Sequence, residues 1–132
     1  MSVFIDTSAL LAVMDADDIH HMQARKAWND IISKSEVLIS HNYVLVETFA
    51  LAQHRLGVEA VSLLQNDVIP ILTVEWINEV NHLSGITALI AANRRKLSLV
   101  DCISFITMRK LGIKRAFTFD KHFKEQGFEC VP

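Results

Sequence analysis

The stretch Val3-Phe4-Ile5-Asp6-Thr7-Ser8-Ala9-Leu10 decides the fold of this 132-residue chain. Its first three residues form a short, continuously apolar run, which is typical of a strand buried on both faces. The run ends at Asp6, and Thr7 or Ser8 is predicted to cap a helix that runs through Met14. The stretch therefore predicts a buried strand followed at once by a helix.

The rest of the chain repeats this alternation of short apolar runs and helical patterns. Further strands are predicted at Val37–Ile39, Ile71–Val74, Ala116–Phe119 and Phe128–Val131. Helices are predicted from an acidic turn at residues 15–18 to about Lys34, and over Tyr43–Leu56, Glu59–Val68, Glu75–Arg95 with an interruption at Gly85, and Ser98–Leu111. Because parallel strands need crossover connections, the pattern predicts an α/β fold with a mostly parallel sheet and helices on both faces.

Length and composition indicate one domain over residues 1–132. With 51% hydrophobic and 21% charged residues the chain has enough apolar material for a compact core. Cys102 and Cys130 are too few for a disulfide scaffold, which favours a reducing compartment. The N-terminus has no basic segment before an apolar one, and the apolar run Ala9–Met14 is too short to cross a bilayer. We therefore expect a cytoplasmic protein without a membrane anchor.

Charge is distributed unevenly along the sequence. The net charge of -2 excludes a protein that holds nucleic acid by bulk positive charge alone. Residues 94–124, however, carry nine basic side chains and only two acidic ones, Asp101 and Asp120. This segment could attract a polyanionic substrate. The alternative is that these Lys and Arg side chains simply solvate the ends of helices.

Asp6 and Asp120 share one arrangement, because each follows a predicted apolar strand. In open parallel sheets, ligands bind beyond the carboxyl ends of the strands. The two aspartates are therefore candidates for a common site. The structural alternative for each is that it caps the helix that follows.

Glu47 and Asp101 are two further carboxylates in apolar surroundings. Glu47 falls in a helix that is apolar nearly all round, where an ionised side chain needs a compensating cation or strong donors. A salt bridge with Arg55 or another Arg is the alternative. Asp101 lies in the first turn of the helix that begins at Ser98, which also suits a capping box.

Carboxylates that meet in one low-dielectric cleft repel one another and need a cation. A set of oxygen ligands without a Cys and His cluster favours Mg²⁺ or Mn²⁺, ions that bind substrate phosphates and activate water. The sequence thus predicts metal-assisted phosphoryl chemistry.

Other polar and aromatic residues give weaker signals. His20 and His21 are adjacent on a helix and point in different directions, which argues against a metal pair. His54 and His122 are interpreted as surface histidines, with His122 close enough to Asp120 to contact a phosphate. Trp28 and Trp76 are expected in a core or an interface. No paired aromatic platform for stacking bases is evident.

Four segments together resemble PIN-domain ribonucleases, and in particular the VapC toxins of toxin-antitoxin pairs. They stand in the order typical of that family and the resemblance covers nearly the whole chain: Phe4–Leu10, Val46-Glu47-Thr48, Leu97–Phe105 and Ala116–Phe123. The resemblance implies a three-layer α/β/α sandwich and an endoribonuclease that uses Mg²⁺ or Mn²⁺. It also implies a homodimer and a small antitoxin protein as partner.

The resemblance also assigns roles to residues. Asp6, Glu47, Asp101 and Asp120 would be the catalytic acids that bind the metal, with Asp6 and Asp101 as the direct ligands. Thr7 or Ser8 would hold the Asp6 carboxylate in place. We expect RNA to be contacted by Arg94, Arg95, Lys96, Lys121 and His122.

Two other classes of protein deserve comparison. Phospho-aspartate receivers and aspartate-nucleophile phosphatases also place Asp after a first parallel strand, but the phosphatases carry a second Asp two residues on, where this chain has Ser8. A PIN-like scaffold that binds RNA or protein without cutting is the non-enzymatic alternative. The presence of all four acids argues against it.

Overall fold

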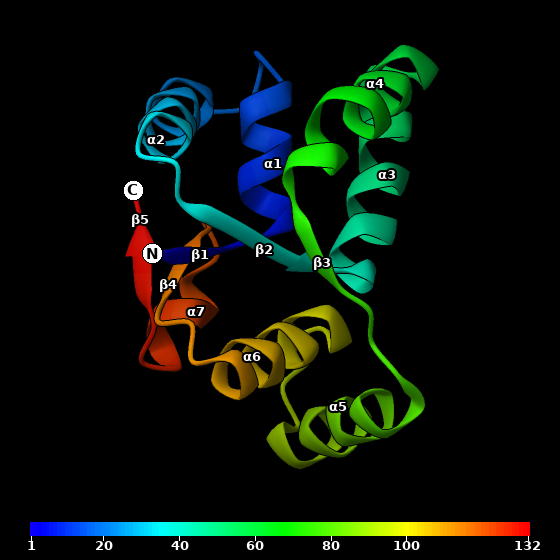
Figure 1. Cartoon of the computed structure of the whole chain (residues 1–132). Coiled ribbons are helices and arrows are strands. Elements are labelled where there is room, and N and C mark those ends of the chain that lie inside the picture. The colour runs from blue at the N-terminus through cyan, green and yellow to red at the C-terminus, as the bar shows by residue number, and fades with distance from the viewer.

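The computed structural model describes residues 1–132 and contains one five-stranded, all-parallel sheet (Figure 1). The strands lie in the order β3-β2-β1-β4-β5, with Val3 opposite Leu38 and Phe4 opposite Ala116. The first strand is therefore central and is paired on both sides. The strand bounds are β1 Ser2–Ile5, β2 Val37–His41, β3 Thr73–Glu75, β4 Arg115–Phe117 and β5 Glu129–Val131.

Helices cover both faces of this sheet. Figure 1 shows α1 to α4 above it and α5 to α7 below it. The upper helices are α1 (Thr7–Met14), α2 (His21–Ser33), α3 (Asn42–Leu56) and α4 (Val58–Leu63), which continues into the π-helical turn η1 (Leu64–Val68) and the 3-10 turn η2 (Ile69–Ile71). The lower ones are α5 (Glu79–Ala92), α6 (Leu99–Leu111) and α7 (Lys121–Glu125). The predicted three-layer α/β/α sandwich is confirmed. None of its helices is long and apolar enough to cross a membrane.

The central strand contributes to a core on each face of the sheet. Val3 and Ile5 pack with residues of α1 and α2, while Phe4 packs with residues of α6 and with Phe123 on the opposite face. All three side chains of the apolar run are fully buried. This explains why the run is continuous rather than alternating.

The strand order fixes where a ligand would bind. The chain proceeds outward from β1 through β2 to β3, and then crosses back to place β4 on the other side of β1. The carboxyl ends of β1 and β4 therefore flank the point at which the direction of winding reverses, which is where open α/β sheets leave a crevice. Asp6 directly follows β1, and Asp120 lies in the loop after β4.

Some predicted boundaries were wrong. The strand expected over Ala116–Phe119 ends at Phe117, so Asp120 is separated from it by a short loop. Asp6 itself occupies the N-cap position of α1, instead of Thr7 or Ser8. Trp76 is 71% exposed, which excludes a place in the core.

The interruption expected at Gly85 is absent, because α5 runs unbroken from Glu79 to Ala92. Gly85 instead packs directly against side chains of α6. A Cβ atom there would meet Ile103 Cδ1 well inside contact distance and Leu99 Cδ1 at 3.2 Å. The glycine is required by helix packing and not by a bend in the backbone.

Gly85→Val is expected to lower the free energy of unfolding by about 1–3 kcal/mol, because the buried Ile103 must move to admit the new side chain. Chemical denaturation monitored by circular dichroism measures the effect. Ser84→Val is the matched control, since Ser84 is the exposed neighbour on the same helix. A loss of the same size in both variants would assign the effect to helix propensity and not to packing.

Candidate active site

Asp6 is a buried carboxylate held by two hydroxyl groups. Its Oδ2 accepts hydrogen bonds from Ser8 Oγ at 2.7 Å and from Thr118 Oγ1 at 2.9 Å. Its backbone N–H donates to the carbonyl of Phe117 at 3.1 Å, which ties the end of β1 to the end of β4. The carboxylate is therefore fixed in place before any ligand arrives.

Burial raises the pKa of Asp6 to about 6. The hydroxyl groups of Ser8 and Thr118 oppose this rise by stabilising the carboxylate, and the negative charges of Asp101 and Asp120 add to it. A buried carboxyl group whose pKa is raised in this way, beside two other acids, is a candidate for a functional site.

Asp101 combines a capping role with a place in the site. Its backbone N–H donates to Ser98 Oγ at 3.1 Å, and its Oδ2 accepts from the Ser98 N–H at 3.1 Å, so the capping box anticipated from the sequence is present. Burial raises the pKa of the Asp101 carboxyl, the nearby Asp120 adds to the rise, and the Ser98 bonds oppose it. Capping alone therefore does not account for where this carboxylate lies.

Asp120 caps α7 by accepting the backbone N–H of His122 at 2.9 Å, and its own N–H donates to Thr118 Oγ1 at 3.0 Å. Thr118 thus contacts both Asp6 and Asp120. This single threonine links the two acids that follow the neighbouring strands β1 and β4.

His122 is buried, which contradicts the expectation of a surface histidine. Its Nδ1 lies 2.8 Å from Asp120 Oδ1 and 3.9 Å from Asp101 Oδ2. Neither contact is a hydrogen bond, and Nδ1 is the one buried side-chain polar atom without a hydrogen-bond partner. Ligand atoms of Asp101, Asp120 and His122 all lie within 4.8 Å of one another.

The chemistry of this group fits a hard divalent cation. Carboxylate oxygens dominate it, as Mg²⁺ and Mn²⁺ prefer, and a single imidazole nitrogen is compatible with Mn²⁺. The raised pKa values of Asp6 and Asp101 and the unpartnered His122 Nδ1 are unfavourable features that a bound cation would relieve.

Glu47 is not among these clustered ligand atoms. It is half-buried on α3 and forms neither a hydrogen bond nor an ion pair, so the alternative of a salt bridge with Arg55 is wrong. Its helix is nonetheless fastened beside Asp6. Thr7 Oγ1 donates to the carbonyl of Val44 at 3.3 Å and accepts from Thr48 Oγ1 at 3.1 Å. Thr7 therefore anchors the turn of α3 that carries Glu47, while Ser8 contacts the Asp6 carboxylate.

A buried histidine that the sequence did not single out positions α6. His41 Nδ1 accepts the N–H of Val44 at 3.2 Å, so its Nε2 carries the proton that is donated to Ser104 Oγ at 2.8 Å. Burial lowers the pKa of His41 to about 3 and keeps the ring neutral. The contact joins the corner between β2 and α3 to the helix that carries Asp101.

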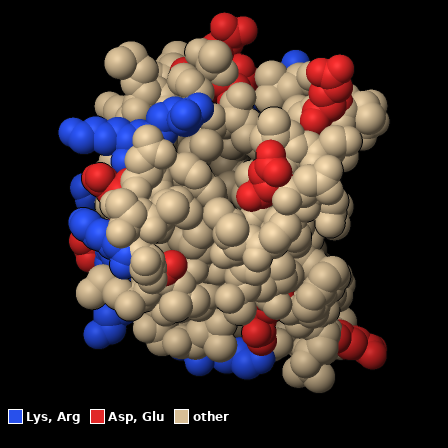
Figure 2. Space-filling view, turned by 45° about the horizontal axis from the view of Figure 1, so that its top comes forward, with Lys and Arg blue, Asp and Glu red and all other residues tan.

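Basic residues lie next to the acids. Arg94 forms an ion pair with Glu125 at 3.0 Å, which holds the loop before α6 against α7, and Arg95, Lys96 and Lys121 are exposed. On the face shown in Figure 2, the visible Lys and Arg side chains lie mainly along the left side and the bottom, with some Asp and Glu among them, while the right side carries mainly Asp and Glu. The two signs of charge are therefore unevenly distributed over this face.

An aromatic platform is present, although none was expected from the sequence. His20 stacks on Phe119 with ring centroids 4.4 Å apart and an interplanar angle of 5°. The two residues are far apart in sequence and meet only where the start of α2 approaches the loop after β4. No local pattern could have revealed the pair.

Comparison with known proteins gives consistent results. The family model described as the PIN domain matches residues 3–129. The 23S rRNA-specific endonuclease VapC20 of Mycobacterium tuberculosis is 34% identical over 127 residues, which make up 96% of this chain and 95% of that protein.

Two solved structures have the same fold. The crystal structure of M. tuberculosis VapC20, described as a Sarcin-Ricin loop cleaving toxin, superposes with a TM-score of 0.87 at 33% identity and covers 99% of this chain and 100% of that one. FitAcB from Neisseria gonorrhoeae has a TM-score of 0.71 at 9% identity, with coverage of 98% and 96%. At that identity the second likeness concerns the fold alone.

Proposed function

The chain belongs to the PIN-domain family, and from this we propose that it is a metal-dependent endoribonuclease, the toxin of a toxin-antitoxin pair. The observation that carries the proposal is the cluster of ligand atoms from Asp101, Asp120 and His122, to which Thr118 links the Asp6 carboxylate. Full-length similarity to a ribosomal RNA endonuclease supports it.

We propose that Asp6 and Asp101 are direct ligands of Mg²⁺ or Mn²⁺ and that Glu47 and Asp120 complete the acidic group. Such an ion would supply a water of lowered pKa and would polarise the phosphate. The protein's part is to hold the acids in position: Ser8 and Thr118 fix the Asp6 carboxylate, and the Ser98 cap fixes that of Asp101. His122 lies where it could bind the same ion or a substrate oxygen.

The substrate proposed is RNA, with 23S rRNA as the first molecule to test, because VapC20 carries that specificity in its name. Arg94, Arg95, Lys96 and Lys121 are proposed to bind its phosphates, since the loop and the helix that carry them adjoin Asp101 and Asp120.

A homodimer and a small antitoxin are the proposed protein partners. The α5 helix supports the dimer, since Val80, Leu83 and Ile90 leave much of their apolar surface in solvent. The antitoxin is proposed from the likeness to VapC20, which is described as a toxin.

The test is incubation of the purified protein with ribosomal RNA in Mg²⁺, in Mn²⁺ and in chelator, followed by mapping of the RNA ends. We expect cleavage at discrete positions in one or both metals and none in chelator. Tight RNA binding without cleavage in either metal would favour the non-catalytic scaffold.

A further inference from the structure

We propose that the pocket between α2 and the β4–β5 edge of the sheet is a subsite for single-stranded RNA next to the bond that is cut, with one nucleobase against Phe119 and a phosphate at Lys26. The inference rests on the proposed nuclease function and deepens it, because it assigns a binding site for the substrate outside the acidic group.

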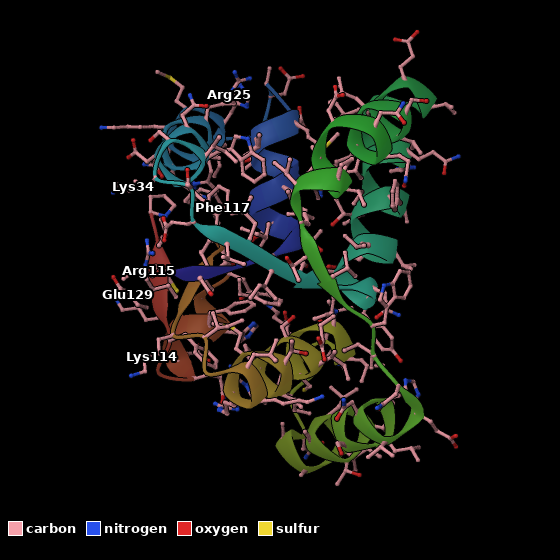
Figure 3. All side chains as sticks on the ribbon, in the orientation of Figure 1. Arg25, Lys34, Lys114, Arg115, Phe117 and Glu129 are labelled. Carbon is pink, nitrogen blue, oxygen red and sulfur yellow. The ribbon has the colours of Figure 1, made fainter.

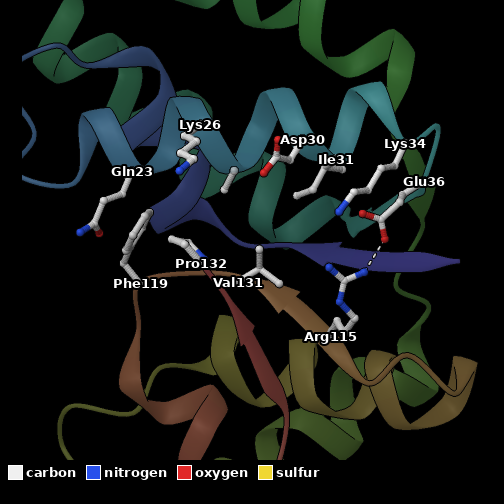
Figure 4. A pocket seen from close by; sticks show the side chains of 11 residues that line it. Gln23, Lys26, Asp30, Ile31, Lys34, Glu36, Arg115, Phe119, Val131 and Pro132 are labelled. Atoms are coloured by element: carbon white, nitrogen blue, oxygen red, sulfur yellow. Dashed lines mark hydrogen bonds and ion pairs between the residues drawn. The ribbon is translucent and has the colours of Figure 1, made fainter.

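The pocket is an elongated hollow of about 520 Å³ (Figure 4). Gln23 and Phe119 lie at one end, and the ion pair between Glu36 and Arg115 closes the other. Its apolar wall is made by Ala27, Ile31, Phe119 and Val131. The apolar surface suits the flat face of a nucleobase, and the polar groups at the rim suit the hydrogen-bonding groups along its edge.

Phe119 connects one end of the pocket to the acidic group. Phe119 directly precedes Asp120, and its backbone N–H donates to Ser8 Oγ at 3.0 Å. The same Ser8 hydroxyl donates to Asp6. A nucleotide that adjoins a phosphate held at Asp6 and Asp120 would therefore reach Phe119 without leaving the protein surface.

Neighbouring aromatic rings hold the Phe119 side chain in a position where a nucleobase could stack on it. His20 covers one face of its ring at 4.4 Å and Phe117 packs edge-on at 6.3 Å. His20 does not line the pocket, whereas Phe119 does, so part of the phenylalanine ring is left for a ligand. Unpaired bases in RNA are commonly bound on such aromatic surfaces, with little dependence on sequence.

The charges at the rim favour a short anionic strand. Arg115 is occupied by Glu36, but Lys26 and Lys34 form no ion pair and face the single unpaired acid Asp30. Lys26 lies on α2 and Lys34 is the C-cap of the same helix, eight residues further on, a span of about 12 Å. Figure 3 places Lys34, Lys114 and Arg115 on the same side of the molecule as β5. A small excess of positive charge beside an aromatic ring is typical of sites that bind single-stranded nucleic acid and not of sites that bind a duplex.

The test compares Lys26→Glu with Arg25→Glu, both made in the Asp101→Asn background so that RNA is bound and not cut. Arg25 is the matched control, because it is an exposed cation next to Lys26 on α2 that lines a different groove. Fluorescence anisotropy with labelled single-stranded RNA should give a dissociation constant at least about fivefold higher for Lys26→Glu and less than about twofold higher for Arg25→Glu. Phe119→Leu, which keeps the apolar packing, should weaken binding at least about threefold.

The location of the bound RNA is tested by ultraviolet cross-linking of the protein to RNA that contains 4-thiouridine. The linked peptides are then identified by mass spectrometry. We expect cross-links in residues 23–34 or at Phe119. Equal binding by the two charge variants, with cross-links confined to residues 94–96, would overturn the subsite. The wild-type cleavage assay separates this result from a failure of the nuclease function, because metal-dependent cleavage by the unaltered protein establishes the nuclease wherever the RNA binds.

Discussion

Replacing Asp101 with asparagine is expected to lower the rate of RNA cleavage at least about a hundredfold. The change removes one negative charge from a proposed metal ligand. The bound ion would stabilise the charge of the transition state by several kcal/mol. Each 1.4 kcal/mol that is lost lowers the rate about tenfold. The asparagine side-chain oxygen can still accept the Ser98 N–H, so the capping box is kept.

The melting temperature of Asp101→Asn in chelator separates a metal ligand from a simple helix cap. We expect it to be unchanged or raised, because burial and Asp120 both disfavour the charged form. Asp17→Asn at an exposed position is the control for the same chemical change. A large fall in melting temperature together with the loss of cleavage would assign Asp101 mainly to capping.

The metal-free protein is expected to lose stability as the pH rises from about 4 to above 6, and Asp6 is the cause. The folded-state pKa of about 6 lies above the ordinary value of 3.8, so the folded protein keeps a proton that the unfolded chain releases. The stability that this bound proton contributes is fully present below the ordinary pKa and is lost as the pH rises through the folded-state pKa. A shift of this size corresponds to about 1–3 kcal/mol.

Urea unfolding of the wild type and Asp6→Asn in chelator, at pH 4 and pH 7.5, measures this effect. Asparagine carries no charge at either pH, so the variant should be the more stable protein at pH 7.5 and should lose most of that advantage at pH 4. Added Mg²⁺ should stabilise the wild type and not the variant, by mass action on the folded state. A difference between the two proteins that is independent of pH would show that Asp6 does not carry the unfavourable charge.

The main features of the fold could be predicted from the sequence, because they depend on periodicity and on short-range preferences. A continuous apolar run at Val3–Ile5 indicates a strand covered on both sides, and the glycines at 57 and 112 mark the ends of α3 and α6. Gly85 misled the prediction, since a glycine that breaks a helix and one that admits a neighbouring helix look the same in sequence.

The candidate site was only partly predictable. Acids after strands could be recognised as a group, but the burial of His122 and the lack of any partner for Glu47 depend on residues from distant parts of the chain. The stacking of His20 on Phe119 likewise depends on the approach of α2 to the loop after β4.

By itself the sequence determined the alternation of strands and helices, the position of Asp6 and Asp120 after two of the strands, and the basic character of residues 94–124. These are properties of neighbouring residues, which the backbone turns into local structure. Only the tertiary structure decided which side chains share a low-dielectric space. Pairing β1 with β4 brought Thr118 between two acids and left His122 Nδ1 beside them. The interaction between charges depends on their distance and burial, and the order of residues along the chain specifies neither.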